Sequence, residues 1–167
     1  MNIMNIIFGL GSNLGNRLQN LRDAVERLRS LGRIMKSSDV YETSAWGGVV
    51  QPDYLNACVS LKAQDESPFE ILNRIKRFER ELGRVESVRW GARKIDIDIL
   101  LIDDLILHSE LLNIPHVSMP LRLFVLVPLR DILPNEWRHP ENGKSIEDMI
   151  EDLRSEGEHV LRVTSLL

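Results

Sequence analysis

Cysteine is almost absent from the sequence, since Cys58 is the single example among 167 residues. One thiol cannot form an internal disulfide, and a structural zinc site built from several thiolates is excluded as well. This scarcity is typical of proteins from a reducing compartment. We therefore expect a cytoplasmic protein.

An excess of basic residues and a long apolar segment are also missing. The formal net charge is -4 and the pI is near 5.6, so the overall charge does not predict binding to nucleic acid or to an anionic membrane. No apolar run is long enough to span a bilayer, and the first residues lack the pattern of a signal peptide. We predict neither a nucleic-acid partner nor a membrane partner.

What the chain does contain is enough apolar sequence for a core. It is 43% hydrophobic and 28% charged, which predicts one globular domain over residues 1–167. Positive charge is local: arginines are frequent between Arg74 and Lys94, directly before a pair of acids.

That pair of acids interrupts an apolar segment, 93–101, that has the character of a strand. Asp96 and Asp98 alternate with isoleucines, so both carboxylates face one side of the strand. Two carboxylates on one face repel each other unless a cation lies between them, and Mg²⁺ prefers such oxygen ligands together with substrate phosphates. Arg93, just before the pair, suits a polyphosphate ligand. The simpler alternative is an edge strand with one solvated face.

The first part of the chain alternates between apolar strands and an amphipathic helix. A strand over 3–10 leads into the glycine-rich segment 9–16, whose spacing fits neither a dinucleotide fingerprint nor a P-loop, so a turn from strand to helix is the plainer interpretation. A helix should follow from about Asn16 and end at Gly32, as with a C-cap glycine.

Two strands and a second helix are predicted next. Segment 33–43 is read as one strand, and 54–62 as another that places Tyr54, Asn56 and Cys58 on one face. Tyr54 and Asn56 could present a ring and an amide to a flat polar ligand, although packing and turn roles are common for such residues.

Ser67, with Pro68 and Glu70 after it, predicts a helix start with a capping box, and Gly83 should terminate that helix. Lys76 and Glu79 lie on its polar face and need be no more than solvated.

The remaining segments are shorter. They are a loop over 84–92 that could close over a phosphate-bearing ligand, a strand over 105–107, a helix over 121–129 with Phe124 and Val125 inward, a helix over 145–153 and a strand over 160–163.

The order of these elements is strand, helix, strand, strand, helix, strand, followed by an appendage. This order predicts an α+β fold of the ferredoxin-like split βαβ type: a mainly antiparallel sheet with helices packed on it and a C-terminal appendage. It is also taken to place the Asp96 strand in the middle of the sheet.

Several ordered motifs resemble the 6-hydroxymethyl-7,8-dihydropterin pyrophosphokinases of folate biosynthesis. They are Gly9-Leu10-Gly11-Ser12-Asn13-Leu14-Gly15, Gln51-Pro52-Asp53-Tyr54-Leu55-Asn56-Ala57, Arg89-Trp90-Gly91-Ala92-Arg93-Lys94-Ile95-Asp96-Ile97-Asp98 and Ile114-Pro115-His116. The resemblance implies an ATP-dependent diphosphokinase that transfers pyrophosphate from ATP to the hydroxymethyl group of the pterin and releases AMP.

The resemblance also implies roles for individual residues. Catalytic roles fall to Arg84, Arg93, Asp96 and Asp98, and the two acids would hold two Mg²⁺ ions. Pterin contacts fall to Thr43, Ser44, Trp46, Tyr54, Asn56, Trp90 and Phe124. ATP contacts fall to Lys76, Glu79, Arg89, Arg93, Ile99, His116 and Arg122. Lys76 stands where the family commonly has Gln. A contact with a neighbouring enzyme of the folate pathway is left open.

Two other functions compete with this one. A Mg-dependent nucleotidyltransferase also uses a Gly-Ser turn and an Asp-x-Asp strand, but there the two lie closer together than Gly11-Ser12 and Asp96 do here. A non-catalytic ferredoxin-like domain that binds a ligand is the second alternative.

Overall fold

The computed structural model describes residues 3–44, 51–64, 66–85, 92–154 and 159–167. The elements are β1 (Ile3–Ser12), α1 (Arg17–Leu28), β2 (Gly32–Ser37), β3 (Asp39–Thr43), β4 (Tyr54–Gln64), α2 (Pro68–Glu81), β5 (Asp96–Ile102), β6 (Leu107–His108), β7 (Asn113–Ile114), the 3-10 helix η1 (Met119–Leu121), α3 (Leu123–Arg130), α4 (Ile146–Leu153) and β8 (Val160–Ser165). The order matches the predicted one with four exceptions: segment 33–43 forms two strands, the strand expected at 105–107 begins at Leu107, β7 and η1 were not predicted, and the helix expected over 121–129 begins at Leu123.

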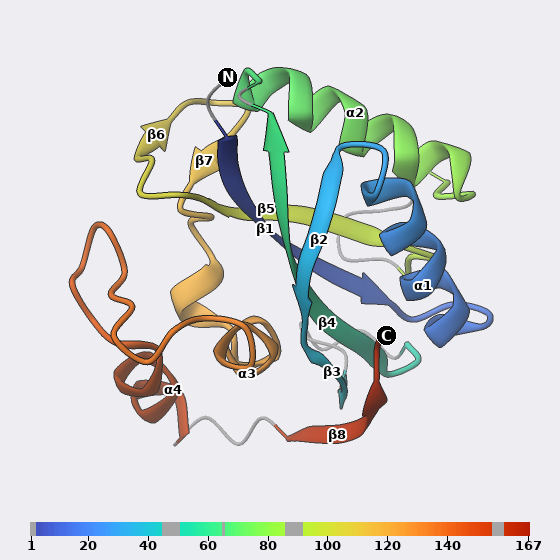
Figure 1. The fold of residues 1–167 in the computed structure, drawn as a ribbon. Helices are drawn as coiled ribbons and strands as arrows, with labels where there is room; N and C mark the ends of the chain where they lie inside the picture. Colours follow the sequence, from blue (N-terminus) through green and yellow to red (C-terminus); the bar gives the residue numbers. More distant parts are fainter. Residues whose placement is uncertain (1–2, 45–50, 65, 86–91, 155–158) are drawn as a thin grey trace.

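The main sheet is antiparallel and lies between two layers of helices (Figure 1). Its order is β5-β1-β4-β3-β8, and β2 also pairs with β4. One hydrophobic cluster joins the sheet to α1 and α2, and a second joins the opposite face to α3 and α4. The predicted α+β ferredoxin-like fold is confirmed. The C-terminal appendage supplies the second helical layer and the edge strand β8.

The position of β5 corrects the sequence-based prediction. We expected the Asp96 strand in the middle of the sheet, but β5 is its edge, and in the described part of the chain it pairs with β1 alone. In a split βαβ unit the first and third strands take the centre, so the strand that follows the second helix is left outside. The alternation itself is confirmed, since Ile95, Ile97 and Ile99 are buried in the core.

Gly32 was predicted to end the first helix, and this is wrong. The helix ends at Leu28, and Gly32 begins β2 instead. A Cβ at Gly32 would lie 2.2 Å from the backbone oxygen of Lys62 on β4. Glycine is therefore required by the close approach of two strands, which a local helix pattern does not reveal.

Segment 33–43 divides at Ser38 because this residue replaces part of the regular ladder to β4. The Ser38 backbone N–H donates to the oxygen of Cys58 over 2.9 Å, and the Ser38 hydroxyl accepts from the Cys58 N–H over 2.8 Å. The two strands on either side of Ser38 therefore pair with different parts of β4.

Apart from Gly32, the predicted helix ends are confirmed at Asn16, which caps α1, at Ser145 and at Gly83. Ser145 forms a capping box with Asp148, and Gly83 terminates the segment of α2 with a φ of 89°. Ser67, in contrast, makes no capping bond through its side chain, so the capping box expected with Glu70 is absent. Across the described ranges, no helix has both the length and the apolar character needed to cross a membrane.

We predict that Gly32→Ala destabilises the protein by about 1 to 3 kcal/mol, as overpacking of a close contact does. Urea unfolding would measure this. Met35→Ala, at a half-exposed position of the same strand, is the control and should cost much less. Equal stability of Gly32→Ala and the parent protein would contradict the close approach.

Candidate active site

A cavity of about 270 Å³ opens where β1, β4 and β5 meet the start of α3. Ten of the residues that the sequence nominates line it: Thr43, Ser44, Tyr54, Asn56, Arg93, Asp96, Asp98, His116, Arg122 and Phe124. Gly9, Gly11, Gln51, Cys58, Leu100 and Val125 line it as well. The cavity therefore brings together aromatic and charged side chains that are far apart in the sequence.

Strand β5 supplies the charged wall. Asp96 and Asp98 lie on its cavity face, while the Ile97 side chain between them is buried in the core on the opposite face. The pairing with β1 shifts after Ile99, since Phe8 faces Ile99 and Ile7 faces Leu101, which leaves Leu100 as an extra residue. Bulges of this kind are common beside functional sites.

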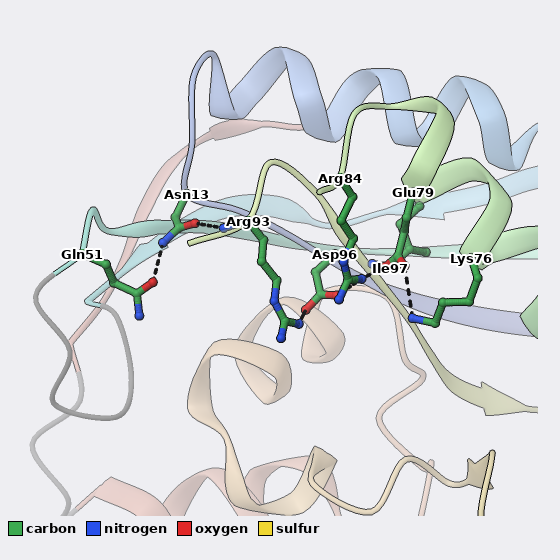
Figure 2. Close-up of polar contacts among 8 residues, drawn as sticks. All are labelled: Asn13, Gln51, Lys76, Glu79, Arg84, Arg93, Asp96 and Ile97. Atoms are coloured by element: carbon green, nitrogen blue, oxygen red, sulfur yellow. Dashed lines mark hydrogen bonds and ion pairs between the residues drawn. The ribbon is translucent and has the colours of Figure 1, made fainter. Parts of the chain in front are cut away.

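The two oxygens of Asp96 each accept an arginine. Arg84 donates through NH1 to Oδ1 over 2.7 Å, and Arg93 donates through NH1 to Oδ2 over 2.9 Å. Figure 2 shows both guanidinium groups converging on this carboxylate. In the free protein the charge of Asp96 is thus balanced by two cations that are themselves suited to bind phosphate.

Glu79 lies next to the ion pair of Arg84 with Asp96. The helix pattern allowed Glu79 to lie on a solvated face, but the side chain is buried. Its exposed fraction is 1%. Oε1 accepts the Ile97 backbone N–H over 2.8 Å and pairs with Arg84 over 2.5 Å, and Oε2 pairs with Lys76 over 3.1 Å (Figure 2). Burial raises the pKa of Glu79, while the charge of Lys76 opposes that rise.

Asp98 lies in an environment that favours its neutral form. Burial, and then the charge of Asp96, raise its pKa to about 6, against the opposing charges of Lys76, Arg122 and Arg84. A cation between the two carboxylates would relieve this repulsion, so the donor set fits Mg²⁺. The described residues contain no group of three or more His, Cys, Asp or Glu side chains that could hold a metal ion, so the protein would supply only this pair. Water and substrate phosphates would complete the coordination.

His116 is held at the cavity by the bulge in β5. Its backbone N–H donates to the oxygen of Leu100 over 3.0 Å, and its Nδ1 accepts the N–H of Ser118 over 3.2 Å. Burial and the charge of Arg122 lower its pKa, so the ring is neutral near pH 7. A neutral imidazole that accepts at Nδ1 carries its proton on Nε2 and can donate it to a ligand.

Two aromatic side chains line the cavity from different elements, Tyr54 from β4 and Phe124 from α3. The Asn56 side chain donates through Nδ2 to the hydroxyl of Thr43 over 2.8 Å, which leaves Oδ1 as an acceptor. A Cβ at Gly11 would lie 3.3 Å from that oxygen, so glycine keeps the space beside it open. The predicted common face of Tyr54, Asn56 and Cys58 is confirmed, since all three line the cavity.

Asn13 is a site residue that the sequence analysis missed. Its Oδ1 accepts the Arg93 N–H over 2.7 Å, and its Nδ2 donates to Gln51 Oε1 over 3.0 Å (Figure 2). Ser12, beside it, donates through its hydroxyl to the oxygen of Lys94 over 2.6 Å. The turn expected over segment 9–16 therefore begins only after Ser12, because β1 continues to that residue. The signal in the sequence is the Ser-Asn pair that closes an apolar strand.

The other nominated residues fall into three groups. Lys76, Glu79 and Arg84 adjoin the charged wall without lining the cavity, and the Ile99 side chain packs in the core. Trp46, Arg89 and Trp90 lie outside the described residues, as does most of the loop predicted over 84–92.

Comparison with known families bears on this site. The model of the family described as 7,8-dihydro-6-hydroxymethylpterin-pyrophosphokinase (HPPK) matches residues 7–134. The chain belongs to the HPPK family. The matched residues include every side chain that we place at the cavity.

Individual HPPK relatives agree with the family match. The chain is 42% identical over 143 residues to a 2-amino-4-hydroxy-6-hydroxymethyldihydropteridine pyrophosphokinase of Aquifex aeolicus, covering 86% of this chain and 88% of that protein. It is 43% identical over 125 residues to the enzyme of that name in Bacillus subtilis, covering 74% of each.

Solved structures confirm the HPPK fold. A crystal structure of wild-type HPPK-DHPS from Plasmodium falciparum with pteroate has a TM-score of 0.73 at 18% identity, covering 92% of this chain. The match takes in 43% of that longer protein. At this identity the likeness concerns the fold alone.

We predict that Asp98 in the ligand-free protein titrates near its raised pKa of about 6. An acid with a raised pKa keeps its proton until the pH passes that value, so cation affinity should fall as the pH drops below it. Carbon-detected NMR of the carboxyl carbons would follow the titration. Asp96→Asn should lower the value by removing a like charge, and titration of Asp98 near 4 in the parent protein would contradict the burial that we describe.

Proposed function

We propose that this cavity carries out the HPPK reaction through the residues that line it. In that reaction ATP donates its terminal pyrophosphoryl group to the hydroxymethyl oxygen of 6-hydroxymethyl-7,8-dihydropterin, and AMP leaves. The observation that carries the assignment of residues is the wall on which Asp96 and Asp98 face the cavity beside arginines. A cation site next to phosphate-binding side chains is what phosphoryl chemistry needs.

Asp96 and Asp98 are the proposed holders of two Mg²⁺ ions. Such ions, when bound, neutralise the charge that develops on the triphosphate. The protein contributes two carboxylates on one face of a strand whose opposite face is fixed in the core. The pair is thus held at a set spacing by backbone geometry.

The arginines on Asp96 are the proposed ligands of the triphosphate. Arg84 and Arg93 each pair with one oxygen of Asp96, so a cation that binds this carboxylate competes with them for its lone pairs and its charge. A released guanidinium can then pair with a phosphate oxygen. His116 and Arg122, on the same cavity, can donate to other oxygens of the nucleotide.

The space between Tyr54 and Phe124 is the proposed pterin subsite. Tyr54 and Phe124 would stack on the two faces of the flat ring, and Asn56 would read a donor on its edge through Oδ1, which accepts no hydrogen bond from the described residues. Thr43, which accepts the Asn56 amide, and Ser44 also line the cavity. This arrangement brings the hydroxymethyl group to the charged wall.

The described site contains no obvious general base for the attacking hydroxyl. Positioning, electrostatic stabilisation and metal ions carry most of the catalysis in transfers of this type. Asp96 can accept a hydrogen bond from the hydroxyl once an arginine has left.

The cytoplasmic location expected from the sequence stays a prediction.

Nucleotide product analysis tests this function. We predict that protein, ATP, Mg²⁺ and 6-hydroxymethyl-7,8-dihydropterin yield AMP only when the pterin is present, and that Asp96→Asn and Asp98→Asn abolish AMP formation. Asp104→Asn, an exposed acid in the turn after β5, is the control and should keep the activity. Formation of ADP would indicate an ordinary kinase, and free pyrophosphate would indicate the nucleotidyltransferase.

The pterin subsite gives a second prediction. Loss of ring stacking in Tyr54→Leu should cost about 0.5 to 1.5 kcal/mol beyond burial and raise the KM for the pterin by about 2- to 10-fold. Tyr54→Phe keeps the ring and should keep the KM, and the KM for ATP should not change in either variant. Steady-state kinetics measure both constants. An unchanged pterin KM in Tyr54→Leu would remove this residue from the subsite.

A further inference from the structure

Glu79 is a buried carboxylate whose oxygens are already engaged within the protein. Oε1 accepts the Ile97 N–H and pairs with Arg84, and Oε2 pairs with Lys76. Its side chain is almost fully covered. A group so enclosed is poorly placed to bind a substrate, although the family resemblance implies that it contacts ATP.

The bond to Ile97 acts on the metal-binding pair. Strand β5 is an edge, and an edge strand carries backbone groups that the sheet leaves unpaired. Glu79 reaches over from α2 and takes the N–H of the one residue that lies between Asp96 and Asp98 (Figure 2). The hydrogen bond from Ile97 to Glu79 therefore fixes the backbone between Asp96 and Asp98 at the open edge of the sheet.

The same residue also holds Arg84. Besides the ion pair, the backbone oxygen of Glu79 accepts the N–H of Arg84 over 2.9 Å. Arg84 is thereby fixed at the point where the chain leaves α2. When its guanidinium leaves Asp96, the contact with Glu79 can keep it beside the cavity.

We propose that Glu79 is a positioning residue that holds Asp96, Asp98 and Arg84 in the arrangement that the metal-nucleotide complex needs, without binding ATP itself. The proposal rests on the proposed function, because it takes the two Asp residues as the metal-binding pair. Residues that orient metal ligands change affinity or activity by about 10- to 100-fold when they are removed.

Three variants separate the possible roles. Glu79→Ala removes the acceptor for Ile97 and the charge that pairs with Arg84. Glu79→Gln keeps a side-chain oxygen for the Ile97 N–H but loses the charge. Glu81→Gln is the control, since Glu81 lies on the same helix and makes only half-exposed pairs with Arg27 and Arg77 among the described residues.

The measurement uses Mn²⁺ with a non-hydrolysable ATP analogue, followed by electron paramagnetic resonance, and steady-state kinetics with ATP. We expect Glu79→Ala to weaken Mn²⁺ binding and to lower kcat by about 10- to 100-fold, with circular dichroism confirming the fold. Glu79→Gln should lose less Mn²⁺ affinity than Glu79→Ala, and Glu81→Gln should match the parent protein.

Two results would overturn the proposal. The first is a folded Glu79→Ala whose Mn²⁺ affinity and kcat equal those of the parent protein. A rise in the KM for ATP alone would not rescue the proposal, because that pattern indicates a residue that binds ATP directly. If Glu79→Ala does not fold, Glu79→Gln decides, and parental Mn²⁺ affinity and kcat in that variant would be the second. Failure of the parent protein itself to bind Mn²⁺ with the analogue would instead remove the proposed metal site, and this inference with it.

Discussion

The pairing of one carboxylate, Asp96, with two arginines is the interaction on which the rest of the site depends. It holds two arginines that can bind phosphate, Arg84 and Arg93, at the place where a metal ion and a triphosphate would meet. It also balances the negative charge of Asp96. Asp98 makes no ion pair with the described residues, and its pKa is raised first by burial and then by the charge of Asp96. Binding of a metal-nucleotide complex would then exchange one set of ion pairs for another, instead of creating charge in a half-buried site.

This arrangement needs β5 to be an edge strand. Because the described sheet continues on one side of β5 only, α2 can bring Glu79 to the open edge, and the bulge at Leu100 can bind the chain at His116. A strand in the middle of the sheet would have both edges occupied. The apolar face of β5 is anchored in the core with α1 and α2, so the fold fixes the acids while leaving their other face open to the cavity.

Local pattern was enough for some features and insufficient for others. Alternation in 95–99 and in 54–58 predicted which side chains share a face, and Ser145 predicted a helix start. The role of Gly32, the burial of Glu79 and the bonds of Asn13 depend on strands or loops distant in the sequence, which periodicity does not report. The edge position of β5 likewise depends on how the whole chain is wound, and the resemblance to a family supplied the assignment of roles that spacing alone left open.

The most direct test of the exchange of ion pairs is Mn²⁺ binding to Arg84→Met without nucleotide, measured by electron paramagnetic resonance. Removal of Arg84 frees one oxygen of Asp96 and removes a positive charge, so the variant should bind Mn²⁺ more tightly than the parent protein, while its affinity for an ATP analogue should fall. Arg80→Met, at an exposed position of α2, should bind both like the parent protein. Unchanged or weaker Mn²⁺ binding in Arg84→Met would contradict the claim that this arginine competes with the metal for Asp96.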